Sequence, residues 1–118
     1  MAAGRYNITI EQGATFSRSI TYSDNNGSGI DISGATVTMQ IRENPDSSTV
    51  ILTASTGADG RIELTDASAG KFSITISASD TSALSFRKGV YQLEVAFTDG
   101  TVDRILEGSV NLSKEVVR

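Results

Sequence analysis

Two side chains that much of enzyme chemistry depends on are missing from this 118-residue sequence, which contains no cysteine and no histidine. Their absence excludes disulfide bonds and thiolate nucleophiles. It also removes the usual general base and the commonest nitrogen ligand of transition metals. We therefore expect a binding or structural protein that is not an enzyme and that needs no cofactor.

Concentrated positive charge is absent too. Ten lysines and arginines against fourteen acidic residues give a net charge of −4 and a sequence pI near 4.6. Binding to a phosphate backbone requires clustered basic residues, so we expect no nucleic-acid partner. No apolar run approaches the length of a membrane span, and residues 1–5 do not begin a signal peptide. We expect neither a membrane partner nor export by the Sec pathway.

The size and composition of the chain fit one small domain. Hydrophobic residues make up 38% of the sequence and charged residues 20%, and folding at this length buries roughly two-thirds of the unfolded surface. We expect a single domain over residues 1–118, with residues 1–5 and 115–118 as flexible or partner-docked termini.

What the chain has in abundance is alternation of apolar and polar residues. Period-two alternation places the apolar side chains on one face of a strand. The clearest example, residues 91–97, is followed by Asp99-Gly100, which is typical of a two-residue hairpin turn. We expect strands at residues 6–11, 15–22, 35–43, 50–52, 62–64, 71–76, 91–97 and from 101 onward.

Three stretches depart from this alternation. Residues 77–84 lose it and offer Ser and Asp as helix caps, which predicts a short helix or 3₁₀ crossover. Arg18 interrupts an apolar strand face, so either the strand lies at a sheet margin with the guanidinium in water or it carries a bulge. A change of parity at residues 104–106 predicts a second bulge or a strand that contacts two surfaces.

These elements predict an all-β fold. Seven or eight short strands, linked by hairpins, favour an immunoglobulin-like antiparallel β-sandwich with one short helical crossover. The cysteine pair and the tryptophan of antibody domains are absent, so this interpretation rests on analogy of the strand pattern.

One loop partly matches a calcium-binding pattern. Asp24, Asn26, Ser28 and Gly29 occupy positions 1, 3, 5 and 6 of such a loop, but position 12, which needs a bidentate glutamate, is Ala35. We interpret the segment as an exposed polar loop and keep a weak metal site as the alternative.

The acidic residues near the last hairpin do not form a catalytic pair. Asp103 and Glu107 share strand parity, but four residues at about 3.3 Å each place them about 13 Å apart, too far for glycoside hydrolysis. This spacing is typical of charges on a solvated strand face.

Aromatic residues offer one candidate contact. Six of the seven, Tyr6 among them, lie where alternation predicts burial. Phe86 instead precedes a strand, beside Arg87 and Lys88, and is the candidate for an exposed anchor that stacks on a partner or a sugar ring. Packing in the core or at a sheet edge is the alternative for Phe86.

Six blocks of sequence carry a resemblance. They are YNITIEQGATF (6–16), IDISGATVTMQIR (30–42), GRIEL (60–64), GKFSITI (70–76), GVYQLEV (89–95) and RILEGSV (104–110). In this order they resemble small virion proteins of tailed bacteriophages, and they are similar to the immunoglobulin-like N-terminal domain of phage baseplate upper proteins. The resemblance spans residues 6–116 and implies a module that docks onto the tail. The baseplate proteins continue beyond this module, whereas this sequence ends at Arg118, so we expect no direct contact with the host.

The resemblance implies a non-enzymatic structural or adaptor protein of the tail, baseplate or fibre-attachment region, present in symmetric copies. Its partners would be other phage virion proteins, and its location the virion after synthesis in the bacterial host cytoplasm. Two alternatives stay open: a capsid decoration protein, and a host-glycan-binding module. From exposure alone, the candidate contact residues are Arg5, Asn25, Asn26, Pro45, Asp46, Phe86, Arg87, Lys114 and Arg118.

Overall fold

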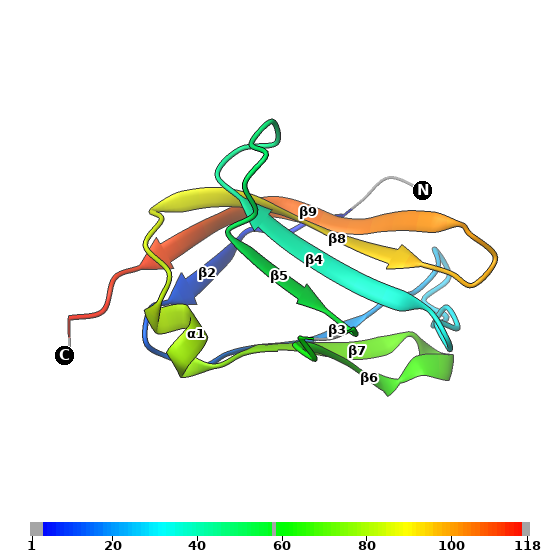
Figure 1. The fold of residues 1–118 in the computed structure, drawn as a ribbon. Helices are drawn as coiled ribbons and strands as arrows, with labels where there is room; N and C mark the ends of the chain where they lie inside the picture. Colours follow the sequence, from blue (N-terminus) through cyan, green and yellow to red (C-terminus); the bar gives the residue numbers. More distant parts are fainter. Residues whose placement is uncertain (1–3, 58, 117–118) are drawn as a thin grey trace.

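Alternating burial along the strands produces two apolar layers that face each other. The computed structural model describes residues 4–57 and 59–116 and shows two packed sheets (Figure 1). The strands are β1 (Gly4–Arg5), β2 (Ile8–Glu11), β3 (Phe16–Thr21), β4 (Thr36–Arg42), β5 (Leu52–Ser55), β6 (Ile62–Asp66), β7 (Lys71–Ile76), β8 (Lys88–Ala96) and β9 (Val102–Ser113). A 3₁₀ turn, η1 (Ala67–Ala69), and one short helix, α1 (Ala78–Ser82), complete the elements of the described residues.

The strands divide into a large and a small sheet. The large sheet has the order β1-β9-β8-β4-β5, with β2 also paired to β9, and the small sheet has the order β3-β7-β6. In Figure 1 the small sheet lies below the large one, and α1 closes one end of the space between them. This strand order is that of an immunoglobulin-like sandwich, as the sequence predicts.

The N-terminal strands correct one part of the prediction. β1 and β2 pair with β9 in parallel, from Gly4 opposite Leu106 to Glu11 opposite Ser113, so the sandwich is not wholly antiparallel. Residues 4 and 5, expected in a flexible or partner-docked terminus, are held in this ladder. β1 and β2 keep one register, and counted as one interrupted strand they give eight strands in the described chain.

The predicted bulge is confirmed at Ile105. Leu93 pairs with Leu106 and Glu94 with Arg104, which leaves Ile105 without an opposite residue. Ile105 is buried, so the extra residue returns the apolar side chains to the core after the change of parity. The hairpin before it spans three residues, 98–100, because the Phe97 N–H bonds to the carbonyl oxygen of Thr101 at 2.8 Å.

The predicted helical crossover is also confirmed. The Ser77 hydroxyl accepts the Asp80 N–H at 3.1 Å and so caps α1. Thr81 on α1 is fully buried, and its hydroxyl donates to the carbonyl oxygen of Ala14 at 2.8 Å. The same hydroxyl accepts the Gly13 N–H at 3.1 Å, which fixes the β2–β3 turn on the helix.

The core lies between the sheets and is built from the inward residues of both. Residues that are fully buried include Ile10, Met39, Phe72 and Leu93. Tyr6 departs from its predicted burial, because half of its surface is exposed where β1 gives way to β2. No helix of the described chain is long and apolar enough to cross a membrane.

Candidate partner-docking face

The outward face of the large sheet is hollowed into a polar groove. Alternation turns Tyr91 and Leu93 of β8 inward and leaves Gln92 outward. Gln92 lies opposite Gln40 of β4 and Glu107 of β9. The groove over these strands has a volume of about 490 Å³ and runs from Arg5 on β1 to the loop after β4. Its floor is built on paired strands, so it is held in shape without a ligand.

Charges of both signs line this groove and its margin. Glu107 lies 3.8 Å from the guanidinium of Arg5 and 3.6 Å from that of Arg104, and Glu94 lies 3.9 Å from Arg104. These pairs are largely exposed and contribute little to stability. Their effect is to arrange alternating charge across β1, β9 and β8.

The loop between β4 and β5 forms one wall of the groove and projects above the large sheet in Figure 1. Arg42 donates a hydrogen bond of 2.7 Å to the carbonyl oxygen of Ser47, and the Asn44 side chain accepts the Asp46 N–H at 3.0 Å. These bonds shape the loop and leave Pro45 and Asp46 exposed.

The groove brings together only some of the sequence-predicted contact residues. Arg5 and Pro45 line it. Asn25 and Asn26 lie in the exposed loop after β3, beyond the pair Thr21–Lys71. Arg87 and Lys114 are exposed near the last residues of β9, where the Lys114 ammonium donates to the carbonyl oxygen of Ser85 at 3.2 Å. Arg118 lies outside the described residues.

Phe86 is not the exposed anchor that the sequence suggested. Only 8% of its surface is accessible, so it packs in the core and cannot stack on a sugar or a partner. Residues 84–87 alternate in burial before β8 begins: Leu84 and Phe86 are buried while Ser85 and Arg87 are exposed, and the parity changes before Gly89, the first buried residue of β8. The Leu112 N–H bonds to the Arg87 carbonyl oxygen at 3.0 Å and holds this segment beside β9.

Asp24 is the strongest candidate metal ligand in the loop after β3, but its carboxylate bonds to the backbone of the same loop. One carboxylate oxygen of Asp24 accepts the N–H groups of Asn26 and Ser28, at 2.9 and 3.0 Å. Within residues 4–57 and 59–116, no three His, Cys, Asp or Glu side chains lie close enough together to hold a metal ion.

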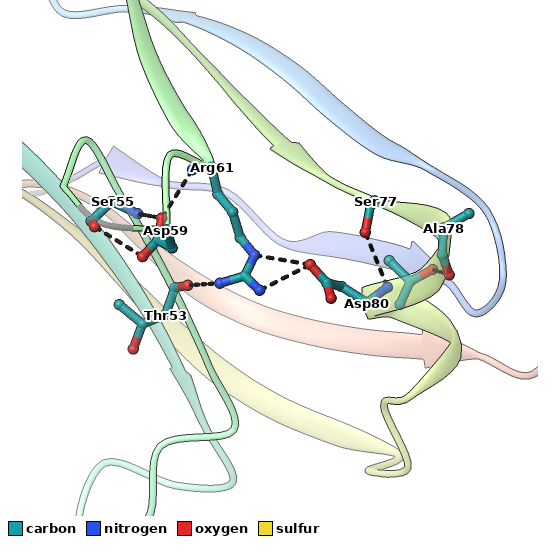
Figure 2. A network of polar contacts seen from close by, with 8 residues as sticks. Thr53, Ser55, Asp59, Arg61, Ser77, Ala78 and Asp80 are labelled. Carbon is teal, nitrogen blue, oxygen red and sulfur yellow. Dashed lines mark hydrogen bonds and ion pairs between the residues drawn. The ribbon is translucent and has the colours of Figure 1, made fainter.

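Sequence reasoning missed an arginine that links the start of β6 to α1 and to β5 of the large sheet (Figure 2). The Arg61 guanidinium donates to one carboxylate oxygen of Asp80 on α1, at 2.9 and 3.2 Å, and to the carbonyl oxygen of Thr53 on β5, at 2.8 Å. The hydrogen bond from Arg61 lowers the pKa of Asp80. Asp59 holds the turn before Arg61 by accepting the N–H groups of Ser55 and Arg61, at 2.8 and 2.9 Å.

Two tyrosines make long-range hydrogen bonds. The Tyr22 hydroxyl donates to Asp103 at 2.8 Å, and the Tyr91 hydroxyl donates to the backbone of Tyr6 at 2.6 Å. Burial, followed by the hydrogen bond and charge of Asp103, raises the pKa of Tyr22 to about 12. Burial is also the main cause that raises the pKa of Tyr91 to about 12.

No family model and no curated protein matches the chain. Among solved structures, it is similar to the extracellular domains of the voltage-gated sodium channel beta4 subunit, described as parallel homodimers that explain the role of that subunit in cell-cell adhesion. The sequences are 15% identical, the match covers 98% of this chain and 97% of the other, and the TM-score is 0.49. The fold assignment rests on the strand order and register, and no function is transferred from this likeness.

Proposed function

We propose that this chain is a non-enzymatic phage virion structural protein that joins other virion proteins of the tail, baseplate or fibre-attachment region through the groove of its large sheet. The groove is the observation that carries the docking part of the proposal. It combines a rigid strand floor, polar side chains and charges of both signs, which suit a protein partner with complementary charges. The assignment to a phage virion rests on the resemblance of residues 6–116 to small virion proteins of tailed bacteriophages.

The side chains of the groove favour docking over catalysis. Glu94 and Glu107 both face Arg104, and Glu107 also faces Arg5. Each carboxylate is already paired with a guanidinium group, and charges at the rim of an interface serve partner choice and orientation. Weak contacts of this kind hold an assembly together when symmetric copies bind at once.

The test places a bulky residue at the centre of the groove. Gln92 is exposed on the groove floor, so Gln92→Trp fills the groove without changing the core. The matched control is Thr75→Trp, at an exposed position on the outward face of β7. We expect phage carrying Gln92→Trp to contain much less of this protein, and phage carrying Thr75→Trp to contain a normal amount, when purified particles are quantified by immunoblot.

Immunogold electron microscopy of intact particles tests the position in the virion. Label at the tail or baseplate supports the proposal. Label over the head replaces it with a capsid decoration protein, the runner-up, which would be present in many more copies. No label with an antibody that detects the purified protein contradicts virion membership. Equal incorporation of the two tryptophan variants contradicts the groove as the docking surface.

A further inference from the structure

The outer edge of β3 is not covered by another strand in the described chain, although the Ser17 carbonyl oxygen there accepts a hydrogen bond from the Arg18 side chain. β3 ends the small sheet, and in the described chain its one strand partner is β7. β2, which precedes it in sequence, pairs with β9 in the large sheet instead. An unpaired strand edge presents backbone N–H and C=O groups to any extended chain that approaches it.

The residues whose backbone groups face outward follow from the hydrogen bonds of the neighbouring strands. The Tyr22 N–H donates to the carbonyl oxygen of Gly70 at 2.8 Å, so even-numbered residues of β3 bond to β7. The Thr75 N–H donates to Arg61 at 2.7 Å, so odd-numbered residues of β7 bond to β6 and not to β3. Both observations direct the odd-numbered backbone groups of β3 away from β7. These belong to Ser17, Ser19 and Thr21.

An apolar recess opens beside this edge. It has a volume of about 120 Å³, and its walls include Phe16 and Ile20 of β3, Tyr6, and Leu106 of β9. Apolar cavities of about 150 Å³ hold a ring the size of benzene, so the recess matches one apolar side chain. A strand added to β3 would place alternate side chains toward this space.

Arg18 lies between the open edge and the recess. Its guanidinium lies 4.6 Å from the centre of the Phe16 ring and donates to the carbonyl oxygen of Ser17 at 2.9 Å. The side chain is exposed, and in the described structure no acidic group pairs with it. An inward-pointing charge on an edge strand discourages apolar pairing unless the partner brings a compensating charge.

We propose that the β3 edge binds an extended segment of a partner protein, which pairs with Ser17, Ser19 and Thr21, places an apolar side chain in the recess and offers a carboxylate to Arg18. A second copy of this chain fits less well. If the β3 strands of two copies pair antiparallel over most of their length, the two Arg18 side chains lie opposite or diagonal to each other. Like charges repel at these positions. The occupant is therefore a foreign acidic strand, and strand addition is the mode of recognition.

The probes are three capped peptides of about eight residues, the length that spans one strand, made of alternating valine and threonine. They carry glutamate, glutamine or lysine in place of one central valine, so that this side chain lies on the same face as Arg18 and the remaining valines lie toward the recess. We expect the glutamate peptide to bind with a Kd below about 1 mM and at least about threefold more tightly than the lysine peptide, which is the contribution of one exposed ion pair. The amide protons of Ser17, Ser19 and Thr21 should exchange more slowly in the complex, as measured by NMR.

Two variants decide between strand addition and other binding. Ser19→Pro removes a backbone N–H that points away from β7 and keeps the hydrogen bonds between β3 and β7, so it should abolish peptide binding. The matched Ser19→Ala should bind the peptide like the wild type. Arg18→Glu keeps the backbone and should reverse the preference to the lysine peptide, which tests the site even if the proline variant folds poorly.

Four outcomes would overturn the inference. These are no binding of any peptide at about 1 mM, undiminished binding by a folded Ser19→Pro variant, an unchanged peptide preference in Arg18→Glu, and a wild-type dimer in sedimentation that Ser19→Pro dissolves. The last outcome would assign the edge to a second copy of this chain. None of these measurements involves the groove, so they fail or succeed independently of the proposed function.

Discussion

The hydroxyl of Tyr91 donates a hydrogen bond of 2.6 Å to the backbone carbonyl oxygen of Tyr6, a residue 85 positions earlier in the chain. The bond forms where β1 gives way to β2, and it satisfies a carbonyl group that the β9 ladder leaves free at this point. It therefore joins the N-terminal strand to the centre of the large sheet.

Tyr91→Phe should lower the free energy of unfolding by about 1–2 kcal/mol, because the Tyr6 carbonyl group loses its partner while the aromatic ring still fills the core. Urea unfolding followed by fluorescence or circular dichroism measures this. Tyr6→Phe is the control, since it keeps the backbone carbonyl and alters a half-exposed side chain. Equal losses in the two variants would show that the hydrogen bond is not the cause.

Stability should fall between pH 10 and pH 12. The pKa values of Tyr22 and Tyr91 rise from 10.0 to about 12 on folding. A group with a raised folded pKa contributes stability that is complete below its unfolded pKa and is lost as the pH rises through the folded value. Urea midpoints measured across this range should fall less steeply for Tyr22→Phe than for the wild type. An unchanged slope would contradict the assignment to Tyr22.

Gly108→Ala should destabilise the fold by about 1–3 kcal/mol, the usual cost of overpacking. A methyl group at this position would overlap the backbone carbonyl group of Tyr6, which cannot move aside as a flexible side chain could. Gly57→Ala is the matched control, because its methyl group would meet only the Ser55 hydroxyl at 3.4 Å. Thermal unfolding compares the two, and similar melting temperatures would contradict the close approach.

Arg61→Ala should destabilise the protein more than Arg104→Ala does. Arg61 donates to Asp80 and to the carbonyl oxygen of Thr53, whereas Arg104 is half exposed and its carboxylate partners lie 3.6 and 3.9 Å away. Hydrogen exchange should show the largest loss of protection in β5 and α1. Equal effects of the two substitutions would mean that the Arg61 contacts do not hold the sheets together.

The acid dependence of stability should also change in the Arg61 variant. The pKa of Asp80 is lowered in the folded protein, so its contribution is present above the ordinary pKa of 3.8 and is lost as the pH falls through the folded value. The difference in urea midpoint between the wild type and Arg61→Ala should therefore shrink as the pH falls below 3.8. A constant difference down to acid pH would contradict the ion pair.

Alternation predicts the faces of the strands but not their neighbours. It located residues 71–76 as a strand and a parity change at residues 104–106, with a bulge as one of two explanations, because both depend on which side chains point inward. The parallel pairing of β1 and β2 with β9 has no such signal. The same limit applies to the groove, whose shape depends on which outward faces lie side by side.

The site residues show the same distinction. The burial of Phe86 could have been predicted only from its alternation with Leu84, because the inward residues of β8 that follow have the opposite parity. The pair Arg61–Asp80 could not have been predicted, since 19 residues separate the two and no local pattern links them. Of the two alternatives that the sequence left for Arg18, the structure has the sheet margin with the side chain exposed, but the contact with the Phe16 ring depends on side-chain conformation.

The parallel pairing of the first and last strands determines how the domain carries mechanical load. β1 begins beside Leu106 and β2 ends beside Ser113, the last residue of β9, so the described chain enters and leaves at opposite ends of this parallel ladder (Figure 1). Tension applied through these ends pulls β1 and β2 against β9 along the strand direction. The hydrogen bonds of that ladder are then loaded together in shear, and none of them can be opened singly by peeling.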